Sequence, residues 1–115
     1  MTLSNPSADD DQETVLYALF LSIKPGKELT PTVIDQHTAH LADLDRQGKL
    51  VLAGPLLARF SGLTVLRVPS LAQARAIAEE DPMIRGRLQT YELATWVMAN
   101  KQNHYRPTVG PARKQ

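Results

Sequence analysis

Residues 14–23 read Thr-Val-Leu-Tyr-Ala-Leu-Phe-Leu-Ser-Ile, and this stretch decides the fold. It is apolar on both alternating faces and rich in residues that favour strands, which is typical of a strand covered on both sides. Turn residues follow at 24–27, where Pro25 and Gly26 end the strand. We therefore expect a strand here, with the rest of the fold built against its two faces.

Two helices are expected, and capping and breaking residues mark their ends. The first runs over 31–47, because Thr30 suits an N-cap and Gly48 a C-terminal stop. The second runs over 71–80 and ends at Asp81, because the residue before a proline avoids the helical region. The remaining apolar segments are expected to be strands, over 50–57, 63–68 and 88–98.

The resulting order, β-α-β-β-α-β, predicts a ferredoxin-like plait. This is an α+β fold with four antiparallel strands and both helices on one face. Gly54-Pro55 within the second strand indicates a bulge or a sheet edge. The face opposite the helices is left bare, although the first strand is apolar on both sides. We therefore expect a homodimer with two sheets packed face to face, or a higher oligomer built from it.

Composition excludes several classes of protein. The 115 residues suit one domain. A net charge of +1 offers no clustered positive excess for nucleic acid. No apolar run approaches the length of a membrane span, and the absence of cysteine excludes disulfides and thiolate metal sites. The N-terminus lacks the cationic and apolar parts of a signal peptide, so we expect a cytoplasmic protein with no nucleic acid or membrane partner.

Charge is distributed unevenly between the two ends. Residues 1–13 hold four acidic side chains and no basic one, whereas residues 101–115 hold four basic side chains and no acidic one. Both ends are polar. We therefore expect a disordered acidic tail over 1–13, a folded domain over 14–98 and a basic C-terminal tail over 99–115. The basic tail is either solvated or packed against a subunit.

Two histidines on the first helix are the main candidates for chemistry. At 100° per residue from Val33, His37 falls at about 40°, in the middle of the apolar stripe, and His40 at about 340°, just off its edge. Both imidazoles therefore lean towards the sheet. Their spacing also permits shared metal ligation, but no third ligand is evident, so we expect no metal and no cofactor. The alternative role is a buried imidazole bonded to a backbone carbonyl.

Other residues have both a structural and a functional interpretation. Asp81 before Pro82 is typical of a capping residue, and a carboxylate keeps further acceptor sites for a catalytic partner. Arg85 is either a surface charge or a ligand for a substrate carboxylate. Gly54 either allows a bulge or lets a ligand approach the strand closely.

Three stretches, taken in order, resemble the YCII-related (YciI-like) family. They are His37-Thr-Ala-His-Leu-Ala-Asp-Leu, Gly48-Lys-Leu-Val-Leu-Ala-Gly-Pro55, and Ser70-Leu-Ala-Gln-Ala-Arg-Ala with Glu80-Asp-Pro and Gly86. The resemblance covers about residues 14–98 and implies a dimeric α+β barrel with a His/Asp pair in a pocket. That pair maps to His40 and Asp81 as catalytic residues. We expect His37, Gly54, Pro55 and Arg85 to bind substrate in the same pocket.

The resemblance implies a small enzyme that needs no nucleophile. His40 would act as general acid or base, and Asp81 would hold one tautomer of its imidazole. One relative in the family is similar to a dehydrochlorinase of hydroxylated aromatics, and related barrels include lactone isomerases. Proton transfer, elimination or isomerisation on a small aromatic or lactone substrate is therefore expected. The alternatives are a non-catalytic ligand-binding module and a structural dimer without a ligand.

Overall fold

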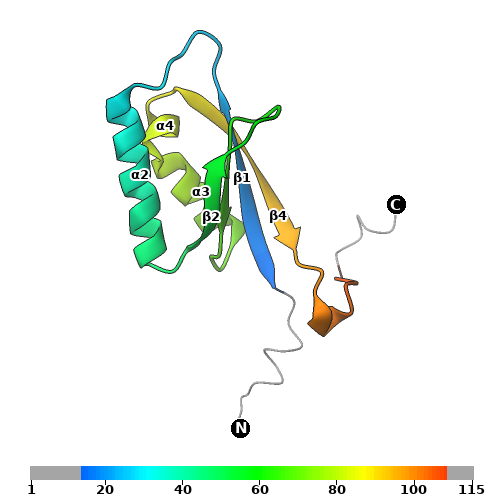
Figure 1. Ribbon diagram of the computed structural model, residues 1–115. Coiled ribbons are helices and arrows are strands. Elements are labelled where there is room, and N and C mark those ends of the chain that lie inside the picture. The colour runs from blue at the N-terminus through cyan, green and yellow to red at the C-terminus, as the bar shows by residue number, and fades with distance from the viewer. Residues whose placement is uncertain (1–13, 109–115) are drawn as a thin grey trace. The chain divides into compact units, whose positions relative to one another are not determined.

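The computed structural model describes residues 14–108, so the acidic tail expected over 1–13 lies outside the described residues, as does 109–115 (Figure 1). The order of elements matches the expected β-α-β-β-α-β, with a single helical turn where only a turn through Gly86 was expected. The elements are β1 Val15–Ile23, α2 Pro31–Arg46, β2 Leu50–Pro55, β3 Gly62–Leu66, α3 Leu71–Glu80, α4 Pro82–Arg85, β4 Gln89–Val97 and a 3-10 helix, η1, Lys101–Asn103.

The four strands form one antiparallel sheet in the order β2-β3-β1-β4, which is the ferredoxin-like order. Tyr17 of β1 lies opposite Leu66 of β3. The strand β2 pairs antiparallel with β3 and forms an edge of the sheet. The sequence indicated an edge or a bulge at Gly54-Pro55, and the structure shows the edge. The irregularity in register lies instead between Leu50 and Leu52.

The helices begin at the residues that the sequence marked as caps. The Thr30 hydroxyl accepts a hydrogen bond from the Val33 N–H at 3.2 Å, and the Ser70 hydroxyl accepts one from the Gln73 N–H at 3.1 Å. Each hydroxyl satisfies a backbone N–H that has no partner within its own helix. Local sequence therefore fixes where α2 and α3 enter the fold.

The three helices lie on one side of the sheet (Figure 1). Leu19 and Leu21 of β1 are buried with Ala78 of α3, and three partly buried side chains pack against this group: Ile84, Tyr91 and Leu93. Successive side chains of a strand point to opposite faces. One alternating set of β1 therefore forms the core beneath the helices and leaves the other set for the opposite face.

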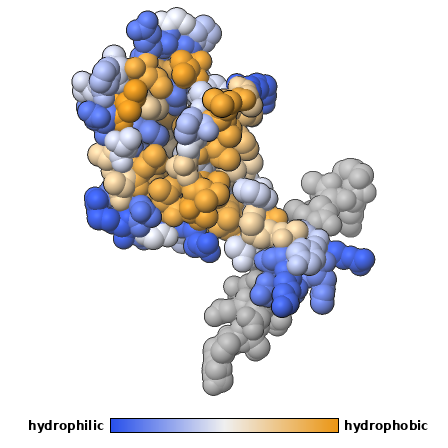
Figure 2. All heavy atoms as spheres, in the orientation of Figure 1, coloured by the Kyte–Doolittle hydropathy of each residue, from blue (hydrophilic) through white to orange (hydrophobic). Residues whose placement is uncertain are grey.

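The sequence suggested that the face of the sheet opposite the helices is bare, but in the structure it is partly covered. Phe60, from the loop after β2, contacts the Phe20 ring with centroids 4.9 Å apart, and the Arg59 guanidinium lies 4.3 Å from the Phe60 centroid. Val65 on this face is only 1% exposed, whereas Leu52 at the edge is 62% exposed. The chain thus covers part of this face itself, and apolar side chains still reach its surface (Figure 2).

Residues 17–95 form one compact unit, and the described residues outside it form another. In this second unit the Met98 N–H donates to the Thr14 carbonyl at 2.9 Å, and the Asn103 amide donates to the Met98 carbonyl at 2.8 Å. Asn100 and Asn103 cap η1 reciprocally. Part of the expected basic tail is therefore ordered, although Tyr105 is 68% exposed. Over residues 14–108, no helix is long and apolar enough to cross a membrane.

Candidate functional site

A cavity of about 400 Å³ lies between α2 and the helix-facing side of the sheet, within the 17–95 unit. Its volume is within the range of small-molecule sites, and its wall is mostly apolar. All four strands, α2 and α4 contribute residues to it. The lining residues are Leu21, Leu29, Ile34, His37, Thr38, Leu41, Ala53, Gly54, Pro55, Ser61, Gly62, Leu63, Thr64, Met83 and Gln89.

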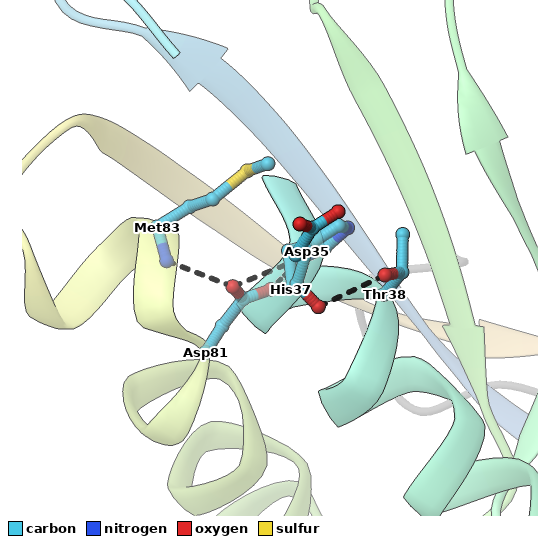
Figure 3. Close-up of polar contacts among 5 residues, drawn as sticks. All are labelled: Asp35, His37, Thr38, Asp81 and Met83. Carbon is cyan, nitrogen blue, oxygen red and sulfur yellow. Dashed lines mark hydrogen bonds and ion pairs between the residues drawn. The ribbon is translucent and has the colours of Figure 1, made fainter. Parts of the chain in front are cut away.

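His37 on this wall is bonded to a carboxylate that is almost fully excluded from solvent (Figure 3). Its Nδ1 lies 3.0 Å from Oδ1 and 2.9 Å from Oδ2 of Asp81. The Asp81 side chain is 2% exposed and that of His37 is 15% exposed. The carboxylate stands behind the imidazole and does not itself line the cavity. A ligand in the cavity would therefore meet His37, with Asp81 as its support.

The position of Asp81 follows from the chain break that proline imposes. Asp81 ends α3, because Pro82 disfavours the helical region for the residue before it. Its carboxylate then caps α4, where Oδ1 accepts from the Met83 N–H at 2.9 Å. The same oxygen is within hydrogen-bond distance of His37, so capping and support of the imidazole coexist, as the sequence allowed.

The structure pairs Asp81 with a different histidine from the one that the resemblance indicated. The resemblance assigned His40 as the partner of Asp81, but Asp81 bonds His37. Among the described residues, His40 neither lines the cavity nor has a hydrogen bond to Asp81. The physical reason is the angle around α2: His37 occupies the middle of the apolar stripe, and a residue three further on is rotated by about 60°. The hypothesis of a His/Asp pair is kept, with His37 in the place of His40.

The expected substrate-binding residues divide in two. Three of them, His37, Gly54 and Pro55, line the cavity as expected. Arg85 does not, because it ends α4 with an exposed side chain. Within residues 14–108, no three His, Asp or Glu side chains gather where they could hold a metal ion.

Two buried polar residues of the wall are absent from the sequence-based site. Thr64 of β3 is 3% exposed and Gln89 of β4 is 4% exposed. A signal for Gln89 existed, because strand alternation places it on the same face as Tyr91 and Leu93, which pack in the core. A glutamine on the buried face of a strand is uncommon enough to be noted.

The His37–Asp81 geometry defines what the imidazole can do. When the carboxylate is ionised it only accepts hydrogen bonds, and Nδ1 of His37 then carries the hydrogen in this pair. In the neutral ring, Nε2 is then the atom with a free lone pair. It can accept a proton from a molecule in the cavity and later return it. The arrangement is therefore suited to proton transfer on a small apolar molecule.

The chain matches a known protein family. The model of the YCII-related domain matches residues 15–97, which is most of the chain. Among curated proteins, no sequence match is found.

A solved structure supports the same fold. It is 5-chloro-2-hydroxyhydroquinone dehydrochlorinase from Burkholderia phenoliruptrix AC1100, in complex with 2,5-dihydroxybenzoquinone. The TM-score is 0.53 at 21% sequence identity, and the match covers 70% of this chain and 92% of that one. At this identity the likeness concerns the fold.

Proposed function

This chain belongs to the YCII-related domain family, and from that premise we propose that it is a small-molecule enzyme in which His37 transfers a proton and Asp81 positions the imidazole. One observation carries the proposal. The solvent-excluded carboxylate of Asp81 is hydrogen-bonded to Nδ1 of His37, whose side chain lines a cavity of about 400 Å³. The buried carboxylate keeps the imidazole in one tautomer and one orientation.

The reaction class that fits this pair is acid–base chemistry without a nucleophile from the protein. The wall offers an imidazole among apolar side chains, which suits proton abstraction, elimination or isomerisation on a small aromatic or lactone ring. The similar dehydrochlorinase makes loss of HCl from a hydroxylated ring the first reaction to test. In that reaction the ring loses one proton and one chloride overall. The imidazole accepts the proton, and chloride leaves with the electron pair of the C–Cl bond.

The test is chloride release from 5-chloro-2-hydroxyhydroquinone by three proteins. We expect His37→Gln to lower kcat by roughly 10²–10⁴-fold. His40→Gln, one turn further along the same helix, is the matched control and is expected to keep wild-type activity. Loss of activity in His40→Gln alone would restore the original assignment of the base. Binding of the substrate without chloride release in the wild type would favour a ligand-binding module instead.

Asp81 is tested by a readout that a structural role would not move. Asp81→Asn keeps an oxygen to cap α4, but the amide no longer fixes the tautomer of His37. We expect kcat to fall by roughly 10²-fold or more. KM should change little, because Asp81 does not line the cavity. A rise in KM with unchanged kcat would contradict the positioning role.

A homodimer is also part of this proposal. Leu52 is 62% exposed on the face opposite the helices, which Phe60 covers only in part. A second copy of the same sheet would bury this apolar surface. Light scattering at micromolar concentration tests it, and we expect the wild type to dimerise and Leu52→Glu to dissociate. A monomeric wild type would contradict the proposal.

A further inference from the structure

Gln89 is the residue of the cavity wall that the proposed proton transfer does not use. It begins β4, lines the cavity and is 4% exposed. Its Oε1 is buried and has no hydrogen-bond partner among the described residues. Other buried side-chain oxygens differ from it, since the carboxylate of Asp81 is bonded to both His37 and Met83. Gln89 therefore carries an unused acceptor next to the cavity, and a rotation of its terminal amide would bring this oxygen to the cavity wall.

The backbone that leads into Gln89 is held by hydrogen bonds. The Leu88 N–H donates to the Met83 carbonyl at 3.0 Å, and the Leu88 carbonyl accepts from the Lys24 N–H at 2.9 Å. Arg87 just before it adopts a positive φ of 60°, which a residue with a side chain rarely does. The chain thus accepts an unfavourable backbone conformation at the turn that leads into Gln89. These contacts fix the backbone that leads into Gln89.

A buried acceptor without a donor lowers the stability of the folded chain, because the oxygen loses its hydrogen bonds to water. Replacement by an apolar side chain of similar length would remove this cost. A residue that costs stability at a concave site is typical of a binding function. We infer that Gln89 is a ligand-binding residue whose Oε1 accepts a hydrogen bond from a hydroxyl or N–H group of the molecule that occupies the cavity.

This inference rests on the cavity of the proposed function and specifies the chemistry of its occupant. The wall is mostly apolar, and its polar side chains include two that can accept hydrogen bonds from an occupant, through Nε2 of the neutral His37 and Oε1 of Gln89. The occupant is therefore a small apolar molecule with a neutral donor, such as a phenolic hydroxyl. An ether or ester analogue, which only accepts, would leave the Gln89 oxygen unpaired and would bind less well.

The experiment compares two probes with the same ring, one with hydrogen-bond donors and one without. Resorcinol donates through its hydroxyls, whereas 1,3-dimethoxybenzene has the same ring and no donor. Dissociation constants are measured by NMR titration of the labelled protein. We expect the wild type to bind resorcinol roughly 10-fold more tightly than the ether, which is the effect of one satisfied buried acceptor. Gln89→Met, which keeps the length and removes the acceptor, is expected to reduce this preference clearly, and Nε2 of His37 accounts for what remains.

Two controls separate binding from folding. Gln36→Met, on the exposed side of α2, is expected to keep the roughly 10-fold preference for resorcinol. The melting temperature of Gln89→Met is expected to equal or exceed that of the wild type. An equal preference in the wild type and Gln89→Met, a wild type that favours the ether, or a wild type that binds neither probe would each overturn the inference.

The outcome is independent of catalysis. Because the titration measures binding, it gives the same answer whether or not His37 transfers a proton. If the wild type releases no chloride, but Gln89→Met still shows a reduced preference for resorcinol over the ether, the proposed reaction is rejected and the role of Gln89 is kept. Chloride release in the wild type with an unchanged preference in Gln89→Met would do the reverse.

Discussion

Two buried polar side chains, one on each side of α4 in the chain, are in opposite states. Asp81, before the helix, is 2% exposed and is bonded to both His37 and the Met83 N–H. Gln89, after the helix, is 4% exposed, and its Oε1 has no partner among the described residues. Satisfied buried polar groups hold a structure together, whereas unsatisfied ones lower its stability. The comparison indicates that Asp81 stabilises the fold, whereas Gln89 contributes to ligand binding in the cavity.

The largest loss of stability is expected from removing Asp81, whose carboxylate has its hydrogen bonds satisfied. Asp81→Ala deletes the cap of α4 and leaves the His37 Nδ1–H without an acceptor, so we expect a loss of about 2–4 kcal/mol in the free energy of unfolding. Urea denaturation monitored by circular dichroism measures it. Asp35→Ala, an exposed aspartate of α2, is the control and is expected to stay within about 0.5 kcal/mol of the wild type. Equal effects of the two changes would break the comparison.

A smaller loss is expected from the partner of that carboxylate. His37→Ala leaves the Asp81 carboxylate buried with only the Met83 N–H as donor, which should cost about 1–3 kcal/mol. His40→Ala removes no hydrogen bond to Asp81 and should cost less than about 0.5 kcal/mol. The same denaturation experiment applies. A larger loss in His40→Ala would show that Asp81 depends on the other histidine in solution.

The change in stability should have the opposite sign at Gln89, whose Oε1 has no partner among the described residues. Gln89→Met removes a buried acceptor without a donor, so we expect the free energy of unfolding to stay unchanged or to rise by up to about 1 kcal/mol. The measurement is again urea denaturation, with Gln36→Met as the exposed reference. A clear loss of stability would mean that the amide already has its hydrogen bonds satisfied in solution.

The smallest effect concerns Tyr91, two residues after Gln89. Burial, and then the hydrogen bond from its hydroxyl to the Glu79 carboxylate at 2.9 Å, raise the pKa of Tyr91 above 10.0. The stability that this group contributes is present below pH 10.0 and is lost as the pH rises through the folded-state pKa. Glu79→Gln should therefore lower the pKa of Tyr91 and weaken this loss. Phenolate absorbance during an alkaline titration measures the change, and an unmoved titration curve would contradict it.

Much of the fold could be predicted from short-range patterns. The doubly apolar β1, the hydroxyl caps Thr30 and Ser70, and the Asp81-Pro82 break place every main element within a few residues. These features act through alternation, backbone capping and the conformational limits of proline, which involve only neighbouring residues. The edge position of Gly54-Pro55 was available for the same reason.

The candidate site was predictable only in part. The angle around α2 placed His37 in the middle of the apolar stripe, whereas the family resemblance led to His40, and the structure agrees with the angle. Two residues one turn apart differ by only about 60° around the helix, so both can face the same side of a domain. Which of them meets Asp81 depends on where α4 docks along α2.

The sequence by itself determined the order of elements, the capping residues and the presence of a buried aspartate beside a histidine-bearing helix. Only the tertiary structure decided the identity of the partnered histidine, the exclusion of Arg85 from the cavity, the cover that Phe60 places on the sheet, and the unpaired oxygen of Gln89. The physical reason is one of range. Local conformation is set by neighbours in the chain, whereas a hydrogen bond between distant segments exists only after packing has fixed their distance and orientation.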